Sequence, residues 1–240
     1  MFQILKKELN SFLNSLIGYI VMGVFLTATG LFTWFFKDNI LDFGYADMNL
    51  FFQIAPFIFL FLIPAITMRA FSEEIKSGTI ELLFTKPLSK WQIVLGKYLA
   101  SCCLILFSLL PTLLYYYSVY QIGNPIGNID SAAVFSAYLG LFLLGCVFAA
   151  IGVLTSSFTD SQVTAFVFSF VICLILFYGI GQLSQLSFLG SFGYIFSQLG
   201  LDYQYNALGK GLIDSRNLIY FFSVIFICLW ITKLKISSLK

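Results

Sequence analysis

Residues 68–97 read MRAFSEEIKSGTIELLFTKPLSKWQIVLGK, and they are the charged exception in an otherwise apolar chain. The whole chain has 13 basic and 11 acidic residues, and eight of them lie in this interval: Arg69, Glu73, Glu74, Lys76, Glu81, Lys86, Lys90 and Lys97. Long apolar runs flank the interval on both sides. It therefore marks a segment that lies outside the membrane, between two apolar stretches long enough to span it.

Composition indicates an integral membrane protein. Of the 240 residues, 60% are hydrophobic and only 10% are charged, and the mean hydropathy is +0.94. A soluble domain of this size could not bury 29 Phe side chains in one core. The solvent for most of this surface is therefore lipid.

The apolar runs predict an all-α, polytopic fold with six transmembrane helices in a single domain, 1–240. A hydrocarbon core of about 30 Å needs roughly 20 apolar residues as helix. The runs are continuous and do not alternate in polarity, which excludes barrel strands. We place the spans at about 16–36, 51–69, 94–118, 133–156, 163–183 and 217–233.

Two segments do not fit a simple span. In residues 1–15 and just beyond, one helical face is apolar and the other polar: Leu5, Leu9, Phe12, Leu13 and Leu16 against Lys6, Lys7, Asn10 and Asn14. This pattern predicts an amphipathic elbow helix in the inner interface, with a plain extension of the first span as the alternative. Residues 184–216 are aromatic and Gly-punctuated, and we expect short interfacial or re-entrant helices on the outer side.

The distribution of Lys and Arg predicts the orientation. With the N-terminus inside, ten basic residues lie in inner segments: Lys6, Lys7, Arg69, Lys76, Lys86, Lys90, Lys97, Lys233, Lys235 and Lys240. Three lie outside: Lys37, Lys210 and Arg216. Cytoplasmic loops are enriched in basic residues, so we expect a multi-pass membrane protein with both termini cytoplasmic. Trp91 and Trp230 then mark inner ends of spans.

The residue types argue against catalysis within this chain. There is no His, which removes the commonest general base and metal ligand. The Gly-Lys pairs at 96–97 and 209–210 lack the pattern of a phosphate-binding loop, so ATP would be hydrolysed elsewhere. The five Cys lie in apolar runs, which disfavours disulfides and metal sites. We expect no enzyme activity, no cofactor, no metal and no nucleic-acid partner.

The charged interval predicts two short helices. Ser72 is expected to cap the first, with Glu73 and Glu74 in its first turn, and Ser77-Gly78 to end it. Thr79 would cap the second, and Lys86-Pro87 would end that one. In the second helix Ile80, Leu83 and Phe84 share one face, with Glu81 and Thr85 on another. The pair would lie flat under the bilayer; an ordinary solvated loop is the alternative.

Other local signals mark helix starts and contacts. The spacings Ser89–Gln92 and Thr159–Gln162 are typical of capping boxes at the inner ends of the third and fifth spans. Small residues in the fourth span predict a close helix contact: Gly140, Gly145, Ala149 and Gly152.

The charged interval resembles the signature of the type 2 ABC exporter permease family. The matching features are Arg69 at the end of a span, Glu73-Glu74, Gly78-Thr79, Glu81-Leu82-Leu83, Pro87, and Gly96-Lys97 entering the next span. The expected elbow, six spans and re-entrant outer helices extend the likeness over the whole chain. Residues 61–89, FLIPAITMRAFSEEIKSGTIELLFTKPLS, are also similar to the gliding-motility-associated (GldF-like) permease subunits of Bacteroidota.

The resemblance implies a partner-driven machine. It implies a half-transporter that pairs with itself or a related permease, in membrane lipid, and with ATP-binding cassette ATPase subunits. It makes residues 70–93 a coupling segment, in which Glu73, Glu74, Gly78, Thr79, Glu81 and Pro87 would contact or shape the contact with the ATPase. It does not extend to the substrate.

Other functions remain open from the residues alone. An ion-coupled transporter or channel would usually have ionisable residues within its spans, and none is evident here. A membrane-embedded enzyme would need clustered carboxylates, and a non-transporting assembly or anchoring subunit would need none of these features. The sequence therefore favours a permease subunit that couples ATP hydrolysis in a separate chain to export.

Overall fold

The computed structural model describes residues 1–36, 39–84, 87–184, 192–211 and 213–238. Within these residues the regular structure is helical throughout, with no β-strand. The expected all-α class is therefore confirmed. The helices are α1 (Phe2–Leu13), α2 (Leu16–Trp34), α3 (Ile40–Phe43), α4 (Asn49–Thr67), α5 (Arg69–Lys76), α6 (Ile80–Phe84), α7 (Lys90–Leu109), α8 (Leu113–Ile122), α9 (Ser131–Phe158), α10 (Gln162–Leu174), α11 (Ile180–Ser184), α12 (Phe192–Leu199), α13 (Leu201–Gly209) and α14 (Ser215–Ser238).

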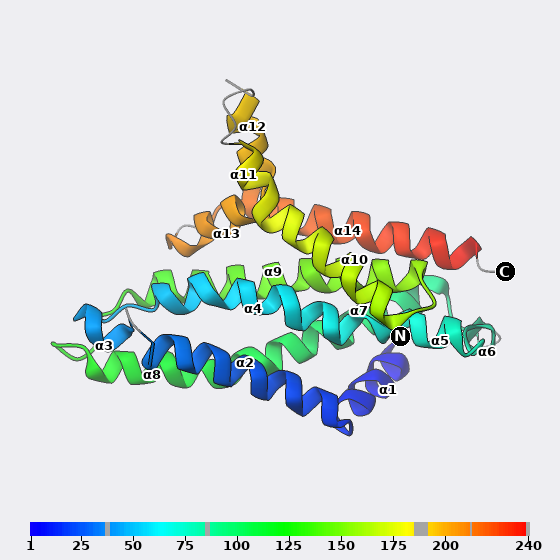
Figure 1. Cartoon of the computed structure of the whole chain (residues 1–240), viewed down its shortest axis with the longest axis horizontal. Helices are drawn as coiled ribbons and strands as arrows, with labels where there is room; N and C mark the ends of the chain where they lie inside the picture. Colours follow the sequence, from blue (N-terminus) through cyan, green and yellow to red (C-terminus); the bar gives the residue numbers. More distant parts are fainter. Residues whose placement is uncertain (37–38, 85–86, 185–191, 212, 239–240) are drawn as a thin grey trace.

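The long helices form an elongated bundle around α9 (Figure 1). Helices α4, α7, α10, α13 and α14 all contact α9, and most of its side chains are buried. One end of the bundle carries both termini, α5 and α6, and we call it the α5 end; the opposite end carries α3 and is called the α3 end. Helices α11 and α12 project sideways from the bundle.

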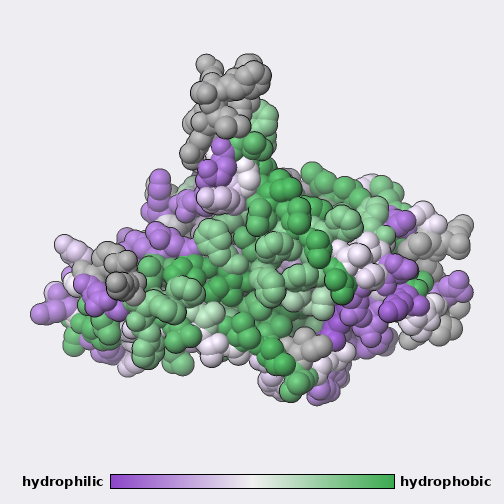
Figure 2. Space-filling view, in the orientation of Figure 1, coloured by the Kyte–Doolittle hydropathy of each residue, from purple (hydrophilic) through white to green (hydrophobic). Residues whose placement is uncertain are grey.

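The surface matches a membrane environment. Figure 2 shows hydrophobic residues across the middle of the bundle and hydrophilic residues toward its two ends. Phe57, Phe168 and Phe222 are each more than half exposed on this apolar surface. Within the described residues, five helices are long and apolar enough to cross a membrane, or up to six if the bent pair of α1 and α2 counts as one span. The chain is a multi-pass membrane protein.

The helices cover the expected spans and run past several of them. The second span continues into α5, so one helical stretch runs from Asn49 to Lys76. The third begins at Lys90 and, through a 3-10 turn at Leu110–Thr112, ends at Ile122. The fifth contains a π-helical turn, Ile175–Gly179, between α10 and α11. Residues 37, 86 and 240, whose Lys entered the orientation census, lie outside the described residues.

Helix α1 is a separate helix, and the chain bends by 67° between it and residues Gly18–Trp34 of α2. Ser15 caps α2 by accepting from Gly18 N–H, which starts a new helix after the break. The buried side chains of α1 are Ile4 and Phe12, whereas Leu16 is 76% exposed. The expected amphipathic division of α1 therefore holds except at Leu16: Leu9 packs against the core beside Phe12, and the polar residues of the other face are exposed. The predicted stripe did not include Ile4, which the contact of α1 with α7 also buries.

The observed helix caps can be compared with those predicted from the sequence. Ser89 and Gln92 make the expected reciprocal capping box at the start of α7. The Thr159 cap is wrong: Ser161 is the residue before α10, and Thr159 Oγ1 donates to the Ser161 carbonyl. The backbone stays extended through Thr159, so its hydroxyl lies too early to reach the first N–H groups of α10.

The Ser72 cap is also wrong. Helix α5 begins at Arg69, so Ser72 lies inside it, fully buried, and donates its hydroxyl to the Met68 carbonyl at 2.5 Å. Glu73 and Glu74 consequently lie beyond the first turn. Because the main chain continues helically from the second span, α5 prolongs α4 toward the α5 end, where a flat segment had been expected (Figure 1).

The small residues of α9 make the predicted close contacts. A Cβ at Gly145 would lie 3.0 Å from Ile105 of α7, and one at Gly140 would lie 3.1 Å from Leu208 of α13. At Gly152 a Cβ would lie 2.7 Å from the Thr67 Cβ and would also clash with Thr67 Oγ1. Of the three glycines, Gly152 makes the tightest contact, and its partner helix is α4.

The segment 184–216 contains two short helices in its described part, α12 and α13, and ends at the start of α14. Helix α13 packs on α9, and the Tyr205 hydroxyl donates to the Phe52 carbonyl of α4 at 2.6 Å. The expectation for residues 184–216 falls partly on 185–191 and 212, which lie outside the described residues. Whether these helices are interfacial or re-entrant stays a prediction.

We expect Gly152→Ala to destabilise the protein by about 1–3 kcal/mol, because the added methyl group overpacks the contact with Thr67. Thermal unfolding of the purified protein in detergent measures this. Gly23→Ala in α2 is the control, since a Cβ there meets no described atom within 4 Å. The double variant Gly152→Ala/Thr67→Ala should recover part of the loss; equal melting of the two glycine variants would contradict the packing argument.

Candidate functional site

A buried ion cluster joins three helices at the α5 end. The Lys97 ammonium of α7 lies 2.9 Å from Glu8 Oε1 of α1 and 3.0 Å from Glu74 Oε1 of α5. Only 3% of the Lys97 side chain is exposed. Its nitrogen also lies 5.2 Å from the ring centroid of Phe71, one turn before Glu74. A single cation thus connects α1, α5 and α7.

The local sequence explains why these helices meet at Lys97. The preceding residue is Gly96, where a Cβ would lie 2.9 Å from Ile4 Cγ2, so a side chain there would push α1 away. Along α1, Ile4, Glu8 and Phe12 follow one another at intervals of four residues and share a face. The same face therefore presents two apolar residues to the bundle and one carboxylate to Lys97.

A polar cleft of about 390 Å³ opens beside this cluster, between α1 and α5. It is lined by Lys7, Glu8, Ser11, Phe12, Arg69, Ala70, Glu73, Glu74, Ser77, Thr79 and Lys97. Lys7 approaches Glu74 Oε1 at 3.9 Å, and the Arg69 guanidinium stacks 4.9 Å from the Phe12 ring centroid. Glu74 Oε2 is buried without a hydrogen bond within the described part of the chain. One buried acceptor oxygen beside the cleft therefore has no partner among the described residues.

The tip beyond this cluster is a sharp turn between α5 and α6. Gly78 has a φ of +69°, a conformation that side chains with a Cβ rarely adopt. The Ser77 and Thr79 hydroxyls are hydrogen bonded at 2.8 Å across the turn. Ile80 is buried, so α6 is anchored by its first residue. These contacts give the turn between α5 and α6 a single backbone conformation, which sets the positions of the exposed residues next to it.

The six residues assigned by sequence divide into two groups. Five are exposed: Glu73, Gly78, Thr79, Glu81 and Pro87, of which Glu73 and Thr79 also line the cleft. Glu74 is different, with 16% of its side chain exposed and its carboxylate turned to Lys97. Of the expected apolar face of α6, Leu83 packs against the core, and the side chain of Phe84 lies outside the described atoms.

Sequence reasoning did not identify Glu8 and Lys97 as a pair. Lys97 had been assigned only to the signature and to topology, and Glu8 to no role. The signal was available in part, because Glu8 interrupts the Ile4–Phe12 stripe where an apolar residue would be expected. Its partner, however, is 89 residues away in the chain.

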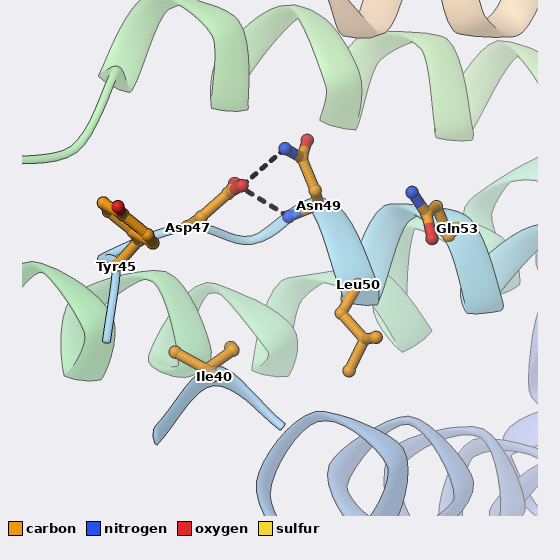
Figure 3. Close-up of a pocket in the computed structure, with 6 residues that line it drawn as sticks. All are labelled: Ile40, Tyr45, Asp47, Asn49, Leu50 and Gln53. Atoms are coloured by element: carbon orange, nitrogen blue, oxygen red, sulfur yellow. Dashed lines mark hydrogen bonds between the residues drawn. The ribbon is translucent and has the colours of Figure 1, made fainter. Parts of the chain in front are cut away.

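Two further cavities with charged lining residues lie away from the α5 end, and the first of them is at the α3 end. The first, about 300 Å³, is lined by Ile40, Tyr45, Asp47, Asn49, Leu50 and Gln53. Figure 3 shows Asp47 facing Asn49, whose backbone N–H donates to Asp47 Oδ1 at 2.9 Å. Asp47 is thereby engaged at the start of α4. Among the described residues that line this cavity Asp47 is the only charged one, and both of its carboxylate oxygens accept hydrogen bonds from Asn49.

The second cavity, about 480 Å³, lies among α11, α12, α13 and the start of α14. Its charged residues are Asp202, Lys210 and Asp214. Burial raises the pKa of the Asp202 carboxyl above its usual value, and the hydrogen bond from Asn206 opposes that shift. This cavity is polar and of mixed charge.

The fold and these sites define a polytopic helical membrane protein with a charged, structured tip at one end. Comparison with protein families agrees: the ABC-2 family transporter protein model matches residues 3–231. The chain therefore belongs to the ABC-2 transporter family and is a permease-type membrane subunit. The comparison with curated proteins gives no match.

We expect Lys97→Met to lower the stability of the protein by about 3 kcal/mol or more, since it leaves the Glu8 and Glu74 carboxylates partly buried without their cation. Thermal unfolding in detergent measures the loss. Lys76→Met, an exposed lysine of the same helix as Glu74, is the control and should change little.

A second variant separates charge from packing. Glu8→Gln/Glu74→Gln/Lys97→Met removes all three charges and should recover much of the lost stability, because neutral groups have no ionic partner to lose. If Lys97→Met melts at the same temperature as Lys76→Met, the ion cluster does not stabilise the bundle.

Proposed function

We propose that this chain is the permease subunit of an ATP-driven exporter and that the α5–α6 tip couples it to a separate ATPase. Membership of the ABC-2 family supports the general assignment. The observation that carries the coupling role is the arrangement of the tip. Exposed carboxylates lie on its surface, and directly behind them Lys97 connects α5 to α1 and α7.

The proposed orientation puts the α5 end in the cytoplasm of a bacterium, with the chain in the inner membrane. Basic residues gather at this end, on α1, α5, α7 and α14: Lys6, Lys7, Arg69, Lys76, Lys90, Lys97, Lys233 and Lys235. Away from this end the described basic residues are Lys210, directly after α13, and Arg216, at the start of α14. This asymmetry favours a cytoplasmic α5 end by the positive-inside rule.

The tip has two distinct parts in this mechanism. Glu73 and Glu81 are exposed and suit contact with a basic groove on the ATPase, on a backbone shaped by Gly78, Thr79 and Pro87. Glu74 faces inward and would transmit a displacement of α5 to Lys97 and hence to α1 and α7. A rigid ion cluster behind a contact surface moves neighbouring helices together, which is what coupling requires.

A second permease half would complete the transporter. In α10–α11 and α14, 22% and 28% of the most apolar stretch is buried within the chain, against 78% in α9. These helices therefore have apolar surface available for lipid or for a second permease. We infer a homodimer or a pair with a related permease.

The narrower proposal, a role in gliding motility, rests on the resemblance of residues 61–89 alone, and no substrate is proposed.

Glu81→Lys should weaken association with the ATPase at least tenfold, since it reverses an exposed charge at the proposed contact. Co-purification and permease-dependent ATPase activity measure this. Asp160→Lys, at an exposed acidic residue of the same end but outside the tip, is the control. In the native host the same Glu81 variant should stop gliding if the narrower proposal holds. Unchanged association and activity would remove Glu81 from the coupling surface.

Cysteine labelling tests the orientation. In a background with the five native Cys replaced, Lys76→Cys at the α5 end and Asp42→Cys at the α3 end are both exposed. In intact cells a membrane-impermeant maleimide should label position 42 and leave position 76 unlabelled until the membrane is opened. Labelling of both positions from the same side would overturn the proposed topology.

A further inference from the structure

The polar cavity among α11, α12, α13 and the start of α14 lies where two long apolar stretches end. Its lining includes Ser184, the last residue of the stretch Gln162–Ser184, and Asp214, which directly precedes the stretch Ser215–Ser238. Both stretches are long and apolar enough to span a membrane, and the ends of such helices lie near the boundary between hydrocarbon and headgroups. The cavity is therefore at the depth of lipid headgroups, away from the α5–α6 tip (Figure 1).

The charged residues of this cavity are not paired with one another. Asp202 and Asn206 of α13 and Lys210, directly after it, follow at intervals of four residues and all line the cavity. Asp202 Oδ1 accepts from the Asn206 amide at 2.8 Å, and Asp214 Oδ1 accepts from the Arg216 backbone N–H at 2.9 Å. Within the described part of the chain, the ion pairs shorter than 4.0 Å include none of the cavity's charged residues. One ammonium and two carboxylates thus belong to a single cavity, without an ionic partner there.

Asn217 of α14 is independent evidence for a ligand. It lines the cavity and is only 9% exposed. Its backbone N–H donates to the Asp214 carbonyl at 3.2 Å, whereas its side-chain amide has no hydrogen-bond partner among the described residues. Buried polar side chains are nearly always hydrogen bonded, so an exception calls for a partner that binds there. The amide can both donate to a ligand and accept from it.

Lipid can reach the cavity from the membrane. In the stretches Gln162–Ser184 and Ser215–Ser238, only 22% and 28% of the most apolar part is buried within the chain. Both stretches therefore keep most of their apolar surface outward, and both end at the cavity. A headgroup held in the cavity would have its acyl chains against these outward surfaces.

A zwitterionic headgroup with a primary ammonium fits the partners that the cavity offers. Its phosphate suits the ammonium of Lys210, and its own ammonium has three N–H donors for the Asp202 carboxylate and the Asn217 amide oxygen. The volume of about 480 Å³ is within the roughly 300–1,000 Å³ of small-molecule sites. An anionic headgroup would meet two carboxylates without a cation to offer them, and a choline group has no N–H to donate.

We propose that this cavity binds the headgroup of a phospholipid of the phosphatidylethanolamine type. Lys210 binds the phosphate, Asp202 and Asn217 accept from the ammonium, and the acyl chains lie along the outward surfaces of α10–α11 and α14. In the proposed orientation of the chain the lipid belongs to the outer leaflet. The binding chemistry itself does not depend on that orientation.

The test is lipid binding to the full-length protein in detergent, measured by native mass spectrometry with phosphatidylethanolamine, phosphatidylcholine and phosphatidylglycerol of the same acyl chains. The native chain should bind phosphatidylethanolamine most tightly. Asp202→Asn and Lys210→Gln should each weaken that binding about tenfold, the loss expected for a hydrogen bond to a charged group. Arg216→Gln is the control, because it removes an exposed cation at the start of α14 that does not line the cavity, and it should leave binding unchanged.

A third variant keeps the test independent of folding. Asn217→Leu has nearly the same volume and removes an amide that has no partner within the described chain, so it should not lower the melting temperature. It should nevertheless weaken phosphatidylethanolamine binding about threefold or more, since the amide would no longer bind the ammonium. Unchanged binding by all three cavity variants would overturn the proposal, as would equal binding of the three lipids by the native chain.

Two further arms distinguish other occupants by thermal unfolding. Glycerophosphoethanolamine has the same headgroup without acyl chains, and stabilisation equal to that by the lipid would rule out a membrane lipid as the occupant. Calcium is the other competitor, because carboxylate and amide oxygens are its usual ligands. Stabilisation by calcium that Asp202→Asn abolishes, with no preference for phosphatidylethanolamine, would assign the cavity to a cation and overturn the proposal. None of these measurements involves the ATPase or the side of the membrane, so failure here is distinguishable from failure of the proposed function.

Discussion

A single buried ammonium determines how the charged end of this bundle is built. Lys97 enters a low-dielectric environment, where an unpaired charge would be costly, and two carboxylates from different helices neutralise it. Because those carboxylates come from α1 and α5, the positions of both helices relative to α7 are set by one group. Gly96 allows the approach by leaving room for Ile4. The exposed tip of α5 and α6 is therefore mounted on a cross-connected base.

The apolar part of the bundle depends on a different device, the small residues of α9. In lipid, hydrophobicity does not drive helices together, so close packing must do so. Gly140, Gly145 and Gly152 let α13, α7 and α4 approach α9 in turn. Helices α10 and α14 also contact α9 but keep much of their apolar surface outward. The tight core and the outward surfaces thus belong to different helices, which suits a subunit that assembles with others in the membrane.

The α5 end presents charges of both signs on different helices. Carboxylates are exposed on α5 and α6, whereas the Lys233 ammonium of α14 lies over the indole rings of Trp91 and Trp230. Basic residues and indole rings together are typical of the ends of membrane spans. The exposed carboxylates of the tip are the exception at this end, which is why the proposed coupling role is assigned to them.

The sequence by itself determined the class, the helices and several of their ends, because these depend on local hydropathy and on neighbouring residues. The capping box at Ser89 and the break at Gly78 involve atoms within a few residues, and both were predictable. Ser72 and Thr159 were misread, because a hydroxyl caps a helix only from the residue directly before its first turn. Ser72 already lies inside α5, and α10 begins only after Ser161. The tertiary structure alone decided that Glu74 turns inward and that Glu8 is its companion. Those choices follow from helix packing across 89 residues of chain, which no local pattern encodes.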